Sequence, residues 1–266
     1  MADRYVVIGN PVAHSKSPWI HAQFAKAAAQ DMEYGRLEAP LGGFARAVDE
    51  FRAQGGRGAN VTLPFKQEAF HYATRRTDRA QAAEAVNTFR FDGQDVLGDN
   101  TDGVGLLRDL TANAGRTLSG ARVLLMGAGG AAQGVLAPLL AARPARLVIA
   151  NRTAEKARAL ARRFPGAAGG GYEEIGSAPF DILVNATSAG LSGEAPPVPP
   201  GAFAAGALAY EMVYGRDTPF LALARRCKAE TRDGLGMLVE QAAEAFLLWR
   251  GQRPQTAQVL AALRGS

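Results

Sequence analysis

The sequence of 266 residues contains a single cysteine, Cys227, so no disulfide can form within the chain. A lack of disulfides is typical of proteins that stay in a reducing compartment, and we therefore expect a cytoplasmic location. The first residues show no signal-peptide pattern, which is consistent with that location. Cys227 lies in no motif, and we expect it to be structural.

The sequence also lacks the main features of nucleic-acid-binding, membrane and metal proteins. Its net charge of +5 comes mostly from scattered arginines and not from a basic run, so we expect anionic small ligands and no nucleic-acid partner. Residues 123–142 are nearly uncharged, but four glycines, Gln133 and Pro138 make them too polar for a membrane span. No Cys/His cluster, complete calcium loop or Ser–His–Asp arrangement is visible, and we expect no metal.

Short apolar runs alternate with helical patterns, which predicts an α/β fold with mainly parallel open sheets. We expect strands at residues 5–8, 33–37, 58–61, 123–126, 146–150, 181–185 and 207–212. We expect helices at residues 18–29, 44–54, from the glycine-rich turn to about 142, and at 154–164, about 236–250 and 254–263. Ser17 is expected to cap the first helix, and residues 169–171 and 196–200 are expected to be loops.

The most specific single motif is Gly127-Ala-Gly-Gly-Ala-Ala132, which follows one expected strand and opens a helix. It matches the G-x-G-x-x-A form of a dinucleotide-binding turn. Gly127 permits the tight turn, Gly129 lets the backbone approach a pyrophosphate, and Ala132 allows close packing of helix on strand. The pyrophosphate would lie at the helix N-terminus, where free N–H groups favour an anion. The motif predicts a Rossmann domain in the second half of the chain.

The next strand ends at Asn151-Arg-Thr153, with Lys156 shortly after. Units that bind NAD carry an acidic residue near this place, about 20 residues after the glycines, to hold the ribose 2′-hydroxyl. Here Arg152 could instead pair with a 2′-phosphate, while Thr153 donates a hydrogen bond and Lys156 adds positive charge. The pattern predicts NADP, although a plain helix start capped by Thr153 would also explain it.

Polar side chains gather in three segments of the first half. Ser15 and Ser17 offer two hydroxyl donors beside a helix N-terminus, which suits a carboxylate ligand. Capping by Ser17 alone would explain one serine and not the other. His14 has no partner nearby in the sequence, and we expect it to be structural.

An expected strand ends within the second segment, Asn60-Val-Thr-Leu-Pro-Phe-Lys66, so Thr62 and Lys66 should project where open α/β sheets bind ligands. The third comprises residues 85–88 and 98–103. Its Asn87 and Asp102 suit a ligand with several hydroxyl groups, although a turn followed by a helix cap would also explain residues 98–103.

Together these segments resemble the shikimate dehydrogenase family. The resemblance spans most of the chain and includes residues 9–18, 60–66, 85–88, 98–103, 127–131, 151–153, 185–188, 210–214 and 233–241. It implies an NADP-dependent oxidoreductase that reversibly reduces 3-dehydroshikimate to shikimate in chorismate and aromatic amino acid biosynthesis. It also implies a substrate domain of residues 1–103 plus 236–266, an NADP-binding Rossmann domain of residues 104–235, and a cleft between them. The family contains monomers and homodimers.

The resemblance also implies roles for individual residues. Lys66 and Asp102 would be the catalytic pair. The substrate would be bound by Ser15, Ser17, Thr62, Lys66, Asn87, Asp102, Tyr214 and Gln241. The cofactor would be bound by Asp78, Gly127, Ala128, Gly129, Gly130, Ala131, Asn151, Arg152, Thr153, Lys156, Met212 and Gly234, with Met237 also flanking the nicotinamide. Glu211 departs from the family pattern, which often has Asp at this position. We expect this difference to affect only the packing of the local loop.

Three other functions remain open at this point. A quinate/shikimate dehydrogenase of the same fold could use NAD, although Arg152 argues against NAD. A non-catalytic nucleotide-binding sensor would need neither Lys66 nor Asp102. An NADP-linked enzyme acting on a pterin or an amino acid semialdehyde fits the paired serines and the hydroxyl-binding groups less well than an enzyme acting on a small hydroxy acid.

Overall fold

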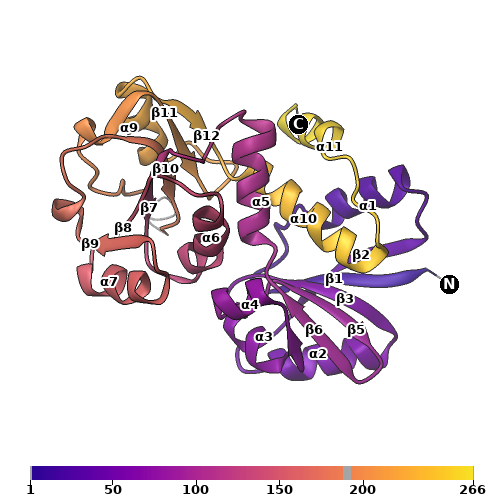
Figure 1. Ribbon diagram of the computed structural model, residues 1–266. Helices are drawn as coiled ribbons and strands as arrows, with labels where there is room; N and C mark the ends of the chain where they lie inside the picture. Colours follow the sequence, from indigo (N-terminus) through magenta and orange to yellow (C-terminus); the bar gives the residue numbers. More distant parts are fainter. Residues whose placement is uncertain (1, 188–192, 266) are drawn as a thin grey trace. The chain divides into compact units, whose positions relative to one another are not determined.

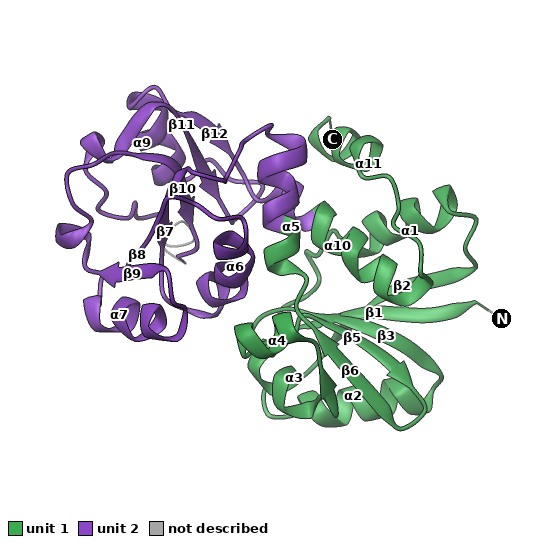
Figure 2. Ribbon diagram, in the orientation of Figure 1, with its two compact units in different colours: residues 1–105, 239–266 green, residues 106–238 purple. Residues whose placement is uncertain are grey.

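The computed structural model describes residues 2–187 and 193–265, and the chain divides into two compact units (Figures 1 and 2). Unit 1 contains residues 1–105 and 239–266, and unit 2 contains residues 106–238. Each unit is built on one six-stranded sheet, which confirms the predicted α/β class. The chain thus returns to unit 1 after completing unit 2.

The sheet of unit 1 has the strand order β2-β1-β3-β5-β6-β4. Its strands are β1 (Asp3–Gly9), β2 (Met32–Glu38), β3 (Gly56–Val61), β4 (Arg75–Arg76), β5 (Thr88–Asp92) and β6 (Asp95–Asp99). Its helices are α1 (Ser17–Ala27), α2 (Phe44–Ala53), α3 (Lys66–Tyr72), α4 (Asp78–Ala83), most of α10 (Leu235–Arg250), and α11 (Ala257–Arg264). Helix α5 (Asp102–Arg108) begins in unit 1 and ends in unit 2.

This sheet is mixed, because β5 pairs antiparallel with both β3 and β6. The hairpin of β5 and β6 was not among the predicted strands. The sequence of β5 does carry a short strand pattern. Phe89 and Phe91 are apolar and buried, whereas Arg90 between them is charged and exposed. Alternation with a period of two is typical of a strand. Gly93, at φ +57°, makes the turn between the two strands.

The sheet of unit 2 has the order β12-β11-β10-β7-β8-β9, and all its pairs are parallel. The strands are β7 (Arg122–Met126), β8 (Arg146–Ala150), β9 (Ala167–Gly170), β10 (Phe180–Asn185), β11 (Phe203–Glu211) and β12 (Glu230–Arg232). Among the described residues, the α-helices that lie wholly in unit 2 are α6 (Gly130–Ala141), α7 (Ala154–Arg163) and α9 (Pro219–Arg226). The central strands are buried on both faces, as expected for a parallel sheet covered by helices.

Two local predictions are wrong. Gly169 was assigned to a loop but lies in β9 with Gly170. A Cβ on Gly169 would lie 2.3 Å from the Ala157 carbonyl oxygen, so glycine is needed for the close approach of α7. Ser17 is the first residue of α1 and not its cap; Lys16 occupies the cap position, without a side-chain cap bond.

The strand β12 was not predicted, because its three residues are too few to show a strand pattern in the sequence.

No helix of residues 2–187 and 193–265 is long and apolar enough to cross a membrane.

Candidate functional site

A lysine and an aspartate that are 36 residues apart in the sequence form an ion pair in unit 1. Lys66 is the first residue of α3 and Asp102 the first of α5. Lys66 Nζ lies 2.6 Å from Asp102 Oδ2, and the side chains are 27% and 11% exposed. A charged hydrogen bond that is partly shielded from water is stronger than one at the open surface. The structure therefore brings the two expected catalytic residues into direct contact.

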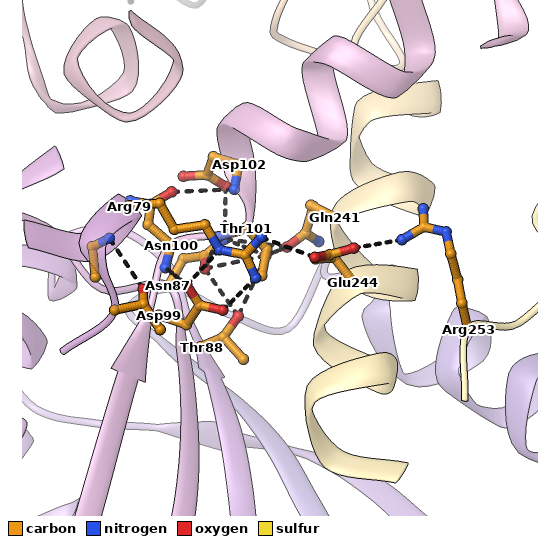
Figure 3. Close-up of polar contacts among 12 residues, drawn as sticks. Arg79, Asn87, Thr88, Asp99, Asn100, Thr101, Asp102, Gln241, Glu244 and Arg253 are labelled. Carbon is orange, nitrogen blue, oxygen red and sulfur yellow. Dashed lines mark hydrogen bonds and ion pairs between the residues drawn. The ribbon is translucent and has the colours of Figure 1, made fainter. Parts of the chain in front are cut away.

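The second oxygen of the same carboxylate is held by a buried amide (Figure 3). Asn87 Nδ2 donates to Asp102 Oδ1 at 2.8 Å, and Asn87 Oδ1 accepts from the Thr101 backbone N–H at 2.8 Å. Gln241 of α10 adds its Oε1, which lies 3.3 Å from Asn87 Nδ2 and 3.2 Å from Thr101 Oγ1. The orientation of the Asp102 carboxylate is thus set from both sides, by a cation and by an amide.

Backbone contacts hold the segments that carry this pair. The Val86 N–H donates to the Lys66 carbonyl at 2.9 Å. The Asn100 side chain donates to the Ala85 carbonyl at 3.1 Å and accepts from the Asp102 N–H at 3.1 Å. These hydrogen bonds join segment 85–87 to the start of α3 on one side and to segment 99–102 on the other.

Asn60 is a buried polar residue that was not predicted to be part of the site. Its Nδ2 donates to Thr88 Oγ1 at 3.0 Å, and its Oδ1 accepts from the Tyr34 hydroxyl at 2.7 Å. An asparagine between apolar neighbours in a buried strand was the sequence feature that could have predicted this role.

Thr62, which was predicted to bind the substrate, is half-buried. A Cβ on Gly9 would lie 2.5 Å from Thr62 Cγ2, so the glycine makes room for this side chain.

The two predicted carboxylate-binding serines lie together at the start of α1. The Ser17 N–H donates to Ser15 Oγ at 3.2 Å, and the Arg36 guanidinium donates to the Ser15 carbonyl at 2.6 Å. Ser17 is buried and Ser15 half-buried, whereas His14 is exposed. The contact of Arg36 brings a positive charge to this turn, which favours an anionic ligand.

In unit 2, the glycine-rich turn between β7 and α6 has the geometry that the motif requires. Gly127 has φ +106°, a conformation that side chains other than glycine rarely adopt. A Cβ on Gly129 or Gly130 would meet no other group within 4 Å, so packing inside the protein does not require glycine there. Ala132 is fully buried where α6 packs on the sheet. The turn fits a dinucleotide pyrophosphate approaching the backbone at Gly129 and Gly130.

The segment after β8 presents positive groups to solvent. Arg152, Thr153 and Lys156 are all exposed, while Asn151 Nδ2 donates to the Thr153 carbonyl at 3.0 Å. The pKa of Tyr172 is raised to about 12 by burial, against the opposing effect of the Arg152 charge. The nearby Glu155 pairs with Arg158 and Arg162. Among the described residues Arg152 forms no ion pair with a carboxylate, so its guanidinium can pair with a phosphate.

The end of β11 holds a buried carboxylate, Glu211, at the position where the sequence departs from the family that it resembles. Glu211 accepts from Asn185 Nδ2 at 2.7 Å, Thr218 Oγ1 at 3.0 Å and the Val213 N–H at 3.2 Å. Burial raises the pKa of Glu211 despite these donors. The carboxylate therefore fixes the loop that follows β11, which contains the predicted ligand residues Met212 and Tyr214.

The other predicted residues are placed as follows. A Cβ on Gly234 would lie 2.1 Å from the Met212 carbonyl oxygen, so glycine is required for the close approach of these segments. Tyr214 is half-buried in unit 2, and burial raises its pKa. Asp78 is exposed at the start of α4 in unit 1. Ser188, part of the segment 185–188, lies outside the described residues. No cluster of three metal-ligating side chains occurs in residues 2–187 and 193–265.

Three protein-family profiles match the chain. They are the shikimate dehydrogenase substrate binding domain over residues 7–89, shikimate / quinate 5-dehydrogenase over residues 109–191, and the shikimate 5'-dehydrogenase C-terminal domain over residues 234–264. The matches fall in both units and cover most of the chain.

Whole-chain relatives agree with these matches. The shikimate dehydrogenase (NADP(+)) of Dechloromonas aromatica is 61% identical and aligns over 99% of this chain and 98% of its own. An Ael1 enzyme from Pseudomonas putida has a solved structure with a TM-score of 0.93 and 50% identity, covering 98% of both chains. The shikimate 5-dehydrogenase of Thermus thermophilus, solved in complex with NADP(H) and shikimate, is 35% identical with a TM-score of 0.89, covering 99% of both chains.

Proposed function

The chain belongs to the shikimate dehydrogenase family, and we propose that Lys66 and Asp102 perform the proton transfer of the family reaction. That reaction is the reversible, NADP(H)-dependent reduction of 3-dehydroshikimate to shikimate, a step of chorismate and aromatic amino acid biosynthesis. The observation that supports the assignment best is the 2.6 Å contact between Lys66 Nζ and Asp102 Oδ2.

Reduction of the ring ketone needs a proton as well as a hydride. NADPH, when bound, supplies the hydride to the carbonyl carbon and becomes NADP+. The ketone oxygen then gains negative charge, and the Lys66 ammonium stabilises it and donates one proton to it, leaving a neutral amine. In the direction of shikimate oxidation, the neutral amine accepts the hydroxyl proton. Each turnover in the direction of reduction therefore consumes one hydride and one proton.

Asp102 orients this proton donor. One carboxylate oxygen accepts from Lys66 and the other from Asn87, so the carboxylate cannot rotate freely. An ammonium group has three N–H donors, and the contact with Asp102 uses one of them. The other two remain for the substrate oxygen and an adjacent hydroxyl. We assign Asp102 the further role of accepting a hydrogen bond from that hydroxyl.

The remaining predicted residues would bind the substrate and cofactor. Ser15 and Ser17 would donate to the substrate carboxylate. Thr62, Asn87, Gln241 and Tyr214 would contact its hydroxyl groups.

For the cofactor, the turn at residues 127–131 would hold the pyrophosphate, and Asn151, Arg152, Thr153 and Lys156 the adenosine 2′-phosphate. Met212, Gly234 and Met237 would flank the nicotinamide, with Asp78 as a further cofactor contact. A cytoplasmic location, suggested by the single cysteine, and a monomeric or homodimeric state belong to the same proposal.

The experiment that tests this function compares initial rates for four pairs: shikimate or quinate, each with NADP+ or NAD+. We expect the highest kcat/KM for shikimate with NADP+, and values lower by about tenfold or more with NAD+, because only NADP+ carries the 2′-phosphate that Arg152 would bind. Comparable rates with quinate and NADP+ would instead assign the chain as a quinate/shikimate dehydrogenase. Absence of turnover with all four pairs would contradict the proposal and favour a nucleotide-binding sensor.

A further inference from the structure

A buried carboxylate lies directly before the segment that carries Asp102. Asp99 is the last residue of β6 and is 0% exposed. Its Oδ1 accepts from Thr77 Oγ1 at 2.6 Å, Arg79 Nε at 2.6 Å and the Asn100 N–H at 2.7 Å, and its Oδ2 accepts from Arg79 Nη2 at 2.5 Å. A buried charge of this kind is tolerated only when it is paired and hydrogen-bonded.

The backbone around Asp99 is part of the site. The Asp99 carbonyl accepts from the Asn87 N–H at 3.0 Å, and Thr101 and Asp102 follow within three residues. A shift of Asp99 would therefore move the two groups that contact the Asn87 side chain. Arg79 donates to both oxygens of the Asp99 carboxylate, and among the described residues it forms no hydrogen bond or ion pair with Lys66 or Asp102.

The same guanidinium also reaches the helix that carries Gln241. Arg79 Nη1 donates to Glu244 Oε1 at 2.9 Å (Figure 3). Gln241 and Glu244 are three residues apart on α10, so they lie on the same face of that helix. Burial lowers the pKa of Arg79, but its contacts with Asp99 and Glu244 outweigh burial and raise that pKa above its usual value, so the arginine stays charged.

We propose that Arg79 is a positioning residue for the substrate site: its planar fork fixes the spacing between segment 99–102, which ends in Asp102, and Gln241 on α10. The proposal rests on the function proposed above. Asn87 Nδ2 is hydrogen-bonded to both Asp102 and Gln241, so a change in their spacing would disturb the amide on which both converge. Lysine cannot replace this fork, because it presents a single point charge.

Arg253 offers a matched control within the same network. It pairs with Glu244 Oε2 at 2.6 Å and with Glu240 Oε2 at 2.6 Å. Its side chain is 21% exposed, against 29% for Arg79, so the two arginines are buried to a similar degree. Arg253 shares Glu244 with Arg79, but among the described residues it forms no hydrogen bond or ion pair with Asp99 or the Asn87 side chain. Loss of Arg79 removes one ion pair with α10 and loss of Arg253 removes two, but only loss of Arg79 also removes the ion pair with Asp99.

The test compares Arg79→Gln, Arg79→Lys and Arg253→Gln with the wild type. We expect Arg79→Gln to lower kcat/KM for shikimate by about tenfold to hundredfold, with an unchanged Kd for NADP+ measured by direct binding. Arg79→Lys should lie between Arg79→Gln and the wild type. Arg253→Gln should stay within about twofold of the wild-type kcat/KM, even if its Tm falls.

Two outcomes would overturn the proposal. One is an Arg79→Gln enzyme with a lowered Tm but wild-type kcat/KM, which would make Arg79 merely structural. The other is an equal loss of kcat/KM in Arg79→Gln and Arg253→Gln. If Arg79→Gln does not fold, the KM for shikimate is measured in Glu244→Gln, which weakens the contact of Arg79 with α10. A raised KM supports the proposal, and an unchanged KM overturns it. A wild-type enzyme without shikimate activity would instead refute the proposed function, so the two failures are distinguishable.

Discussion

Replacing Lys66 with alanine is expected to lower kcat for shikimate oxidation by about 10²–10⁴-fold, the usual contribution of a positioned acid or base. This loss corresponds to about 3–5 kcal/mol of transition-state stabilisation. Lys66→Ala removes both the proton carrier and the positive charge that faces the substrate oxygen. The Kd for NADP+ should be unchanged, because the predicted phosphate-binding residues lie in unit 2 and Lys66 lies in unit 1.

The matched control for this variant is Lys26→Ala. Lys26 lies in the last turn of α1 in the same unit and is exposed. It should retain the wild-type kcat, which separates a specific effect of Lys66 from a general effect of net charge. If kcat of Lys66→Ala stays close to wild type while the enzyme remains folded, the proton-donor role is wrong.

The second large effect is expected at the cofactor. Arg152→Ala should raise KM for NADPH by about 10–100-fold, because a hydrogen bond to a charged group contributes about 1.5–3 kcal/mol. KM for NADH should change by no more than about twofold, since NADH has no 2′-phosphate for the arginine to bind. The measured quantity is the ratio of kcat/KM for the two cofactors, which should fall toward one.

Arg162→Ala provides the control for this change. Arg162 is an exposed arginine of α7 that pairs with Glu155 at 2.8 Å. Its loss removes the same charge from the same region, so any effect of net charge alone would appear in both variants. Equal weakening of NADPH and NADH in Arg152→Ala would refute the contact with the 2′-phosphate.

The sequence predicted the structure best where a local motif is compatible with only one backbone conformation. Gly127 was predicted to form a tight turn, and its φ of +106° confirms that only glycine suits the position. The all-parallel sheet of unit 2 was equally accessible, because its central strands are continuous apolar runs separated by helices. Lys66 and Asp102 could be paired only through the family resemblance, since nothing local connects residues 36 apart.

The parts that escaped prediction depend on contacts between distant segments. Gly169 was assigned to a loop because glycine is common in turns; the need for space beside Ala157 exists only once α7 packs on β9. Arg79 is one of thirty lysine and arginine residues, and no motif in the sequence distinguishes it from the others. Its role becomes visible only when the fold brings Asp99 and Glu244 to the same guanidinium.

The central claim is that Lys66 and Asp102 act as one unit, and a double-mutant cycle on kcat tests it most directly. The cycle compares Lys66→Ala, Asp102→Asn and the double variant with the wild type, and a folded state is verified for each. If Asp102 acts on kcat by orienting Lys66, the double variant should fall within about threefold of Lys66→Ala, because no ammonium is left to orient and the asparagine oxygen can still accept a hydrogen bond from the substrate hydroxyl. Losses that multiply, so that the double variant shows the product of the two single effects, would mean that the two residues act independently and would contradict the account.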